Sequence, residues 1–213
     1  MPLVYQHTIN DSTKIAVWHI AEPEDFFLKQ VLLQREISHP HKRLQHLAGR
    51  YLLKELYPDF PYKLIRIANT LKPFLENDRY HFSISHCGVY AAVIVSSRYR
   101  VGADVELITS KVERVKDKFL NQQEQQMLAQ MINSAGIAYS AILTAAWSIK
   151  ESLFKWYGNS AVDFKEHIYI EKISLQDNEG IAFCQFSKDI LIKLPVHFLF
   201  FNNNCISWVL TDV

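Results

Sequence analysis

The sequence predicts an α+β fold built from two α+β halves that meet near residue 100. Segments with helical patterns and segments with strand patterns occur on both sides of this position. They do not alternate strictly, as they would in a doubly wound α/β sheet. The chain has 213 residues, a length that suits one large domain or two small ones with a substantial core. We therefore expect halves of 1–100 and 101–213.

The first half is expected to hold an early strand, two helices and a β-hairpin. The segment KIAVWHI is rich in the β-branched and aromatic residues that favour strands. Ser38 and Pro40 suit the start of the second helix, because a serine hydroxyl can cap a helix and proline fits its first turn. Cys87-Gly88 lies between two β segments and predicts the hairpin turn. The predicted elements cover residues 14–20, 22–37, 41–57, 80–86 and 90–97.

The second half is expected to begin with a strand and to continue with two helices and four or five β segments. The long segment from Tyr139 to Tyr157 predicts a helix that Gly158-Asn159 would end. The sequence DNEG at 177–180 predicts a turn between two of the later strands. The first strand and the shorter helix are expected at 100–107 and 121–132, and the later β segments at 167–175, 181–186, 189–194, 196–201 and 205–210.

Composition excludes several classes of protein. Hydrophobic residues make up 49% of the chain and the formal net charge is +1, which argues against disorder and against nucleic-acid or membrane binding. Between Lys29 and Lys72, nine Lys and Arg residues against three Asp and Glu residues give a local charge of +6. This indicates either a polyanion site or an ordinary solvated helix. Three widely spaced cysteines, and apolar runs far below the roughly 20 residues of a membrane helix, predict a reduced, soluble, cytosolic protein.

The segment VGADVEL carries two acids at strand spacing. Because side chains alternate along a strand, Asp104 and Glu106 are expected on one face, about 7 Å apart, while Val101, Ala103 and Val105 turn into the core. Two carboxylates at this spacing can share a Mg²⁺ that also holds phosphate oxygens. The alternative is an exposed strand edge with two solvated acids.

The segment WSIKESLFKW carries a third acid. Trp147, Glu151 and Lys155 follow one another four residues apart, so they line one side of the predicted helix. Glu151 and Lys155 can form a simple ion pair on a solvated face. If that side faces Asp104 and Glu106 instead, Glu151 becomes a third metal ligand and Lys155 a phosphate-binding cation. Three carboxylates packed together would repel one another without a divalent cation.

Further polar residues are candidates for holding a phosphorylated ligand. Ser85 and His86 lie where a strand turns, a usual place for ligand contacts, although a single histidine there is more often structural. Lys72 precedes a proline and is expected in an extended conformation that leaves its ammonium accessible. The Lys42-Arg43 pair adds positive charge to the basic helix, where such a pair usually marks only a solvated face.

The order of the motifs resembles that of the 4′-phosphopantetheinyl transferase superfamily, in its longer, pseudo-dimeric, surfactin-type branch. The segments LKPFL, FSISHCG, VGADVEL, FLNQQEQQML and WSIKESLFK follow one another from about residue 71 to 155. The acidic strand and the W-x-x-K-E-S-x-x-K helix are the specific part of this resemblance. Leu71, Ser83 and Cys87 depart from the usual residues of the family pattern. The resemblance implies two similar α+β halves with the active site in the cleft between them.

The resemblance also implies a reaction and the residues that carry it. The phosphopantetheine arm of coenzyme A would be transferred to a serine of an acyl or peptidyl carrier protein, with release of 3′,5′-ADP. Glu151 would accept the serine proton and Lys155 would balance charge on the pyrophosphate. The Mg²⁺ ligands would be Asp104, Glu106 and Glu151, and the coenzyme A phosphates would be held by Lys72, Ser85, His86 and Arg43. His86 would contact the 3′-phosphate together with Arg43, for which Lys42 and Arg50 are alternatives.

The two-half layout suggests a monomer whose second half is catalytic and whose first half binds the coenzyme A phosphates. The carrier protein is expected to dock near the metal, on apolar side chains of the segment after Glu106. These are Val112, Val115, Phe119 and Leu120, and the equal alternative is that they form the apolar face of a packed helix. Two other functions remain open: a Mg²⁺-dependent nucleotide phosphohydrolase, and an inert module that binds coenzyme A or a carrier protein.

Overall fold

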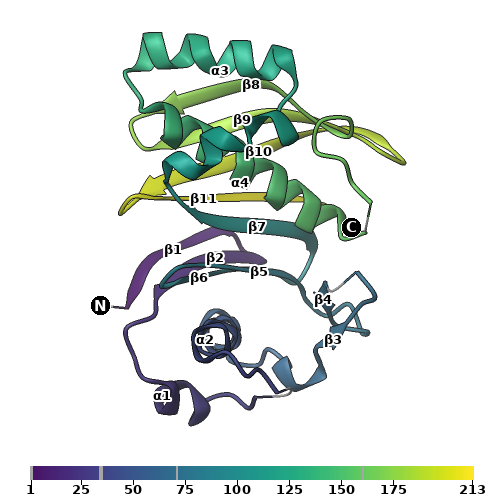
Figure 1. Cartoon of the computed structure of the whole chain (residues 1–213). Coiled ribbons are helices and arrows are strands. Elements are labelled where there is room, and N and C mark those ends of the chain that lie inside the picture. The colour runs from purple at the N-terminus through teal and green to yellow at the C-terminus, as the bar shows by residue number, and fades with distance from the viewer. Residues whose placement is uncertain (1, 34–35, 71, 160) are drawn as a thin grey trace. The chain divides into compact units, whose positions relative to one another are not determined.

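Residues 2–33, 36–70, 72–159 and 161–213 are described by the computed structural model, which is a mixed α+β protein (Figure 1). The chain separates into two compact units. The first unit comprises residues 1–105 and 210–213, and the second comprises residues 106–209. The predicted α+β class is thus confirmed. Within the described ranges, no helix is both long and apolar enough to span a bilayer.

The first unit contains a four-stranded antiparallel sheet in the order β1-β2-β6-β5. Helix α2 packs on β2, β5 and β6, and its residues Leu47, Leu52 and Leu53 are fully buried in the core (Figure 1). Pro40 is the first residue of α2, as expected, but the N-cap is His39 rather than Ser38. The elements are β1 (Leu3–Asn10), β2 (Thr13–His19), α1 (Glu24–Leu28), α2 (Pro40–Leu56), η1 (Tyr62–Leu64), β3 (Arg66–Ile67), β4 (Pro73–Phe74), β5 (His81–Cys87) and β6 (Tyr90–Ser96).

The helix expected over 22–37 is wrong for most of its length. Only residues 24–28 are helical, and residues 34 and 35 lie outside the described ranges. The reason is tertiary. The chain leaves the helix so that Val31 is buried in the core, and the carbonyl of Gln30 accepts a hydrogen bond from Lys54 of α2 at 2.9 Å rather than from a further helical turn. Burial of one apolar side chain outweighs the weak propensity of a short helix.

Two turns in the first unit follow from local chemistry. Gly88 has a φ of +53° in the tight turn between β5 and β6, which confirms the predicted hairpin. The β1–β2 hairpin was not predicted, because β1 lacks a clear alternation of buried and exposed residues. The side chain of Asn10 accepts hydrogen bonds from the amide and hydroxyl of Ser12 in that turn. The cluster Asn10-Asp11-Ser12 was therefore the signal that could have revealed it.

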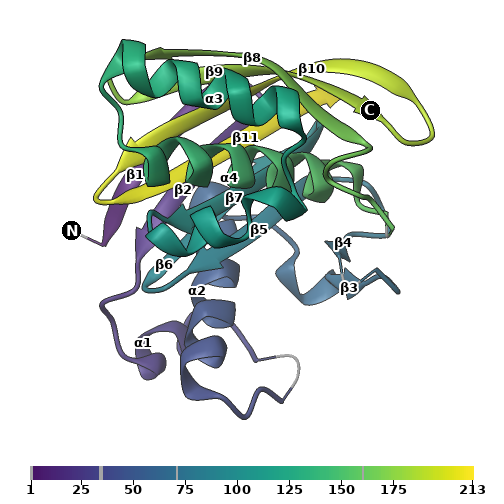
Figure 2. The same cartoon turned by 45° about the horizontal axis from the view of Figure 1, so that its top comes forward.

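The second unit is built on a sheet in which β11, β10, β9 and β8 follow one another, with β7 beside β11 as the fifth strand. Strand β7 ends in this unit with Glu106 and Leu107. Helices α3 and α4 contact each other and β8 on one face of the sheet (Figure 2). The elements are β7 (Tyr99–Leu107), η2 (Ser110–Arg114), η3 (Lys116–Lys118), α3 (Gln122–Ala135), α4 (Tyr139–Tyr157), β8 (Ile168–Gln176), β9 (Glu179–Ser187), β10 (Leu191–Phe201) and β11 (Asn204–Asp212).

Most local signals in the second half are confirmed. Helix α4 covers the predicted residues and ends at Gly158, whose φ is +77°. The two β segments expected at 189–194 and 196–201 are instead one continuous strand, β10. Pro195 donates no backbone hydrogen bond, which favoured a break. It nevertheless pairs with Phe183 of β9 in unbroken register, between Leu194 and Val196.

Gly180 of β9 lies directly opposite Phe198 of β10, and a Cβ at this position would overlap the Phe198 ring. Gly180→Ala is expected to lower the free energy of unfolding by about 1–3 kcal/mol, because the buried ring must move in a packed core. Urea denaturation measures the change. The double variant Gly180→Ala/Phe198→Leu should recover part of the loss, and equal stability of Gly180→Ala and the parent protein would contradict the expectation.

Candidate functional site

Asp104 lies in the first unit, on β7, and is almost completely buried. The hydroxyl of Ser85 on β5 donates a hydrogen bond to its Oδ1 at 2.8 Å. A second contact joins the same strands, since the Ser83 hydroxyl donates to the carbonyl of Ala103 at 3.3 Å. Ser85, which the sequence suggests as a phosphate contact, therefore also fixes the orientation of the Asp104 carboxylate.

Glu106 belongs to the second unit, where it meets helix α4. The indole Nε1–H of Trp147 donates a hydrogen bond to Glu106 Oε1 at 3.1 Å. Glu151 follows Trp147 by one helical turn and Lys155 follows by two, so all three lie along one side of α4. Glu151 and Lys155 are half-buried. The end of the acidic strand and the acidic side of the helix are therefore adjacent in this unit.

Trp147 is held in place by two aromatic residues. The ring of Phe119 packs edge-on against it with centroids 5.1 Å apart, and the ring of Phe164 lies tilted at 5.5 Å. Such pairs have preferred geometries and restrict the rotation of the indole. The two rings therefore hold the indole N–H that donates to Glu106 in one orientation.

The three acids proposed as metal ligands are divided between the units: Asp104 lies in the first, and Glu106 and Glu151 lie in the second. Their carboxylate oxygens are the hard ligands that Mg²⁺ prefers, so the chemistry of the donor set fits this ion. Among the residues that the structure describes, no three His, Cys, Asp or Glu side chains form a ready metal-holding group. The metal site thus remains a prediction.

Lys72 lies in the first unit next to β4 and is half-buried. Burial lowers the pKa of its ammonium to about 8, and the positive charge of Arg100 contributes to the shift. Near pH 8 the Lys72 amine is only partly protonated, and an anion bound beside it would favour the charged form. Leu71, the departure from the family pattern, lies outside the described residues.

His86 lies near the end of β5, close to the first half of α2. It is exposed, whereas the preceding Ser85 is buried, because successive side chains of a strand point to opposite faces. The amide of Gln45 on α2 donates to the carbonyl of Gly88 at 2.8 Å, which fixes the hairpin turn against the helix. Residues of this part of α2 are therefore near the turn that follows His86.

The three basic candidates of α2 differ in their surroundings. Arg43 Nε donates to both carboxylate oxygens of Glu24 at 2.9 Å, and its Nη1 donates to the carbonyl of Ile37. The hydrogen bond with Glu24 raises the pKa of the Arg43 guanidinium. Lys42 is exposed, and Arg50 is buried. A ligand phosphate at Arg43 would therefore share its guanidinium with Glu24 or displace that carboxylate.

The expected apolar docking segment needs correction. Phe119 and Leu120 are 1% exposed and belong to the core of the second unit, so they are not surface contacts. Val112 packs against the same core, and Val115 is exposed. The segment forms two short 3₁₀ helices rather than the face of an α-helix.

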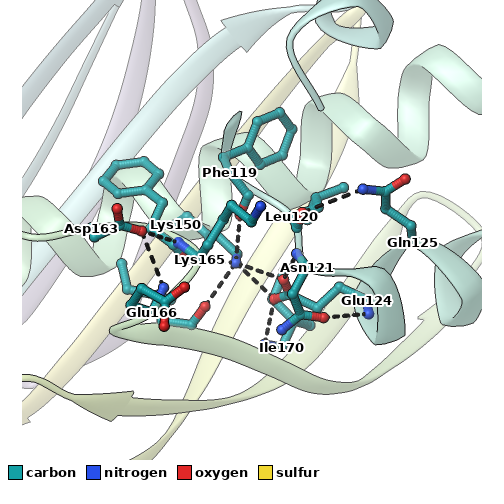
Figure 3. Close-up of polar contacts among 12 residues, drawn as sticks. Phe119, Leu120, Asn121, Glu124, Gln125, Lys150, Asp163, Lys165, Glu166 and Ile170 are labelled. Carbon is teal, nitrogen blue, oxygen red and sulfur yellow. Dashed lines mark hydrogen bonds and ion pairs between the residues drawn. The ribbon is translucent and has the colours of Figure 1, made fainter. Parts of the chain in front are cut away.

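A cluster around Lys150 was missed by the reading of the sequence. Lys150 is fully buried and forms an ion pair with Glu124 at 2.7 Å (Figure 3). Asn121 and Glu124 form a reciprocal capping box at the start of α3. The pattern N-x-x-E before an apolar run was the available signal for that cap. Lys150 is the first lysine of the W-x-x-K-E-S-x-x-K motif, but a lysine inside a helix is ordinarily exposed, so its burial was not predicted.

Part of the chain is similar to proteins of a known family. Residues 100–200 match the family described as the 4′-phosphopantetheinyl transferase superfamily. Enterobactin synthase component D of Escherichia coli strain K12 is 34% identical over 116 residues, which are 54% of each chain. The protein of the same name from Salmonella typhi is 28% identical over 120 residues, 55% of this chain and 49% of that protein. This chain therefore spans about half the length of the curated relatives it matches. The resemblance to the superfamily is confirmed, and the surfactin-type branch stays a prediction.

Proposed function

Given that residues 100–200 match the 4′-phosphopantetheinyl transferase superfamily, we propose that this protein transfers the phosphopantetheine arm of coenzyme A to a carrier protein. The acceptor is a serine hydroxyl of an apo acyl or peptidyl carrier protein, and 3′,5′-ADP leaves. The activity is of the holo-acyl-carrier-protein synthase type and depends on Mg²⁺. The observation that carries the proposal is the Trp147–Glu106 hydrogen bond, which joins the acidic strand to the helix of Glu151 and Lys155.

The proposed metal ligands are Asp104, Glu106 and Glu151. When bound, Mg²⁺ supplies positive charge that stabilises the negative charge developing on the pyrophosphate oxygens. The Ser85 hydroxyl supports this arrangement by donating to Asp104 Oδ1, which orients that carboxylate. The indole of Trp147 does the same for Glu106. Both of these donors are neutral groups.

The remaining side chains handle the proton and the phosphates. Glu151 accepts the proton of the attacking serine, directly or through a water, and Lys155 balances charge on the pyrophosphate. The other coenzyme A phosphates are held in the first unit by Lys72 and His86, with Arg43, Lys42 or Arg50 as a further cation. Ser85 would join them by turning its one O–H from Asp104 to the ligand. Transfer of this kind relies on positioning and electrostatics rather than on a covalent enzyme intermediate.

The proposal gives Lys72 a pH-dependent role. Its folded-state pKa of about 8 lies below the ordinary value of 10.5, so its charge is lost as the pH rises through about 8. The KM for coenzyme A is therefore expected to rise above pH 8, by up to about tenfold per pH unit. Because the unfolded chain keeps this proton longer, the same shift should increase folded stability between about pH 8 and 10.5.

Steady-state kinetics between about pH 7 and 9.5 measure this effect. Lys72→Arg is the matched variant, since arginine stays charged throughout this range and should flatten the KM profile. An identical rise of KM in the parent protein and in Lys72→Arg would show that another group titrates.

Mass spectrometry of a panel of apo-carrier proteins, incubated with the protein, coenzyme A and Mg²⁺, tests the function. Addition of phosphopantetheine to a carrier serine supports the proposal. Release of nucleotide products without a carrier would favour the phosphohydrolase. Binding of coenzyme A without turnover would favour the inert module. Omitting Mg²⁺, or adding a chelator, should abolish the product.

A further inference from the structure

Lys150 is the most highly bonded buried charge in the described part of the second unit. Its ammonium donates hydrogen bonds to the carbonyl oxygens of Phe119, Phe164 and Ile168 at 2.7, 2.8 and 2.7 Å, and to the Glu124 carboxylate (Figure 3). These acceptors come from the segment after η3, the turn before β8, β8 itself and α3. One cation on α4 therefore joins four different segments.

Glu124 extends the same network. Besides Lys150, its oxygens accept the backbone N–H of Asn121 at 2.8 Å and that of Ile170 at 2.9 Å. Both partners of the ion pair are 0% exposed. Burial lowers the pKa of Lys150, against the opposing effect of the Glu124 charge. A buried ion pair is weak evidence for stability by itself, since apolar residues of similar volume often stabilise a core as well.

Two of the residues that accept hydrogen bonds from Lys150 also contact Trp147 of the candidate site. Phe119 and Phe164 offer their carbonyls to the ammonium, and the same two residues place their rings against Trp147. The turn that presents Phe164 is itself fixed, because the Asp163 carboxylate accepts the backbone N–H groups of Lys165 and Glu166. Trp147 then donates to Glu106. An unbroken chain of contacts runs from the buried cation to a proposed metal ligand.

We propose that Lys150 is a positioning residue: through Phe119 and Phe164 it fixes the indole of Trp147, and thereby Glu106 and the side of α4 that carries Glu151. The expected loss of transferase activity rests on the proposed function, whereas the positioning of Trp147 does not. Removing the cation should leave Trp147 free to rotate between less constrained rings. The coenzyme A phosphates should be bound as before, since Lys72 and His86 lie in the first unit.

The test uses the full chain with two variants, Glu124→Gln and Lys150→Met/Glu124→Gln. The double variant removes both buried charges together, so neither is left without its partner. Glu124→Gln keeps the Lys150 ammonium with its three carbonyl acceptors. The first readout is the Trp147 indole N–H signal in a ¹H–¹⁵N NMR spectrum, assigned with Trp147→Phe. The indole of Trp18, bonded to Glu22 in the first unit, is the internal reference. We expect the Trp147 signal to shift or broaden while that of Trp18 stays in place.

The second readout is kinetic. The double variant should lose at least tenfold in kcat, with a KM for coenzyme A within about threefold of the parent value. Lys14→Met is the matched control, because Lys14 also donates to a backbone carbonyl, that of Leu56, and should leave kcat within twofold. If no transferase activity exists, the NMR result alone decides the positioning role.

Three results would overturn the inference. The first is an unchanged Trp147 signal in a folded double variant. The second is a kcat that falls only in proportion to the loss of folded protein. The third is loss of fold in the double variant, because the cluster would then support the whole unit rather than the orientation of one indole.

Discussion

Glu151→Gln is expected to lower kcat for phosphopantetheine transfer by about 10²–10⁴-fold. The substitution keeps the size of the side chain but removes the group proposed to accept the serine proton, a role that contributes about this much in general base catalysis. It also removes one of three negative charges at the proposed metal site, so the Mg²⁺ concentration needed for half-maximal activity should rise. Carrier modification followed by mass spectrometry over a Mg²⁺ titration measures both effects.

Folding should be unaffected, because Glu151 is half-buried on the side of α4 and is not part of the core of the second unit. The Tm should stay within about 2 °C of the parent value, since substitutions of this kind usually change stability little. Glu166→Gln, at an exposed glutamate of the same unit, is the control and should retain full activity. Wild-type kcat in Glu151→Gln at saturating Mg²⁺ would refute the assigned role.

Lys150→Met is expected to lower the free energy of unfolding by about 3–5 kcal/mol, the usual cost of breaking a buried ion pair by removing one partner. Methionine fills a similar volume, but it leaves the Glu124 carboxylate buried without its cation. It also takes the donor from the carbonyls of Phe119, Phe164 and Ile168. Unfilled acceptors of this kind add to the cost.

Urea denaturation of Lys150→Met, Glu124→Gln and the double variant forms a double-mutant cycle. The double variant should be more stable than Lys150→Met, because the buried charge has gone with its partner. Lys14→Met, at a lysine that is only half-buried, should cost less than about 1 kcal/mol. If Lys150→Met also lowered the free energy of unfolding by less than about 1 kcal/mol, water would have to reach the Glu124 carboxylate readily.

Local chemistry made several elements of both halves predictable. The residues of α4, its end at Gly158, the Gly88 hairpin turn and the DNEG turn all depend on neighbours within a few positions. The same is true of the alignment of Trp147, Glu151 and Lys155 along one side of α4. Two predictions were wrong because of contacts between distant segments. The early helix stopped because Val31 is buried elsewhere, and β10 continued through Pro195 because β9 pairs with it on both sides.

The sequence by itself determined which acids and cations are available, on which strand or helix they lie, and which family their order resembles. Only the tertiary structure decided which side chains hold them. Ser85 and Asp104 are 19 positions apart, Glu124 and Lys150 are 26 apart, and Glu106 and Trp147 are 41 apart. Helix and turn patterns extend over a few residues, whereas these contacts form only when whole elements pack and exclude water. For that reason the burial of Lys150, which the sequence shows only as one lysine of the W-x-x-K-E-S-x-x-K motif, became evident only in the polar network of the second unit.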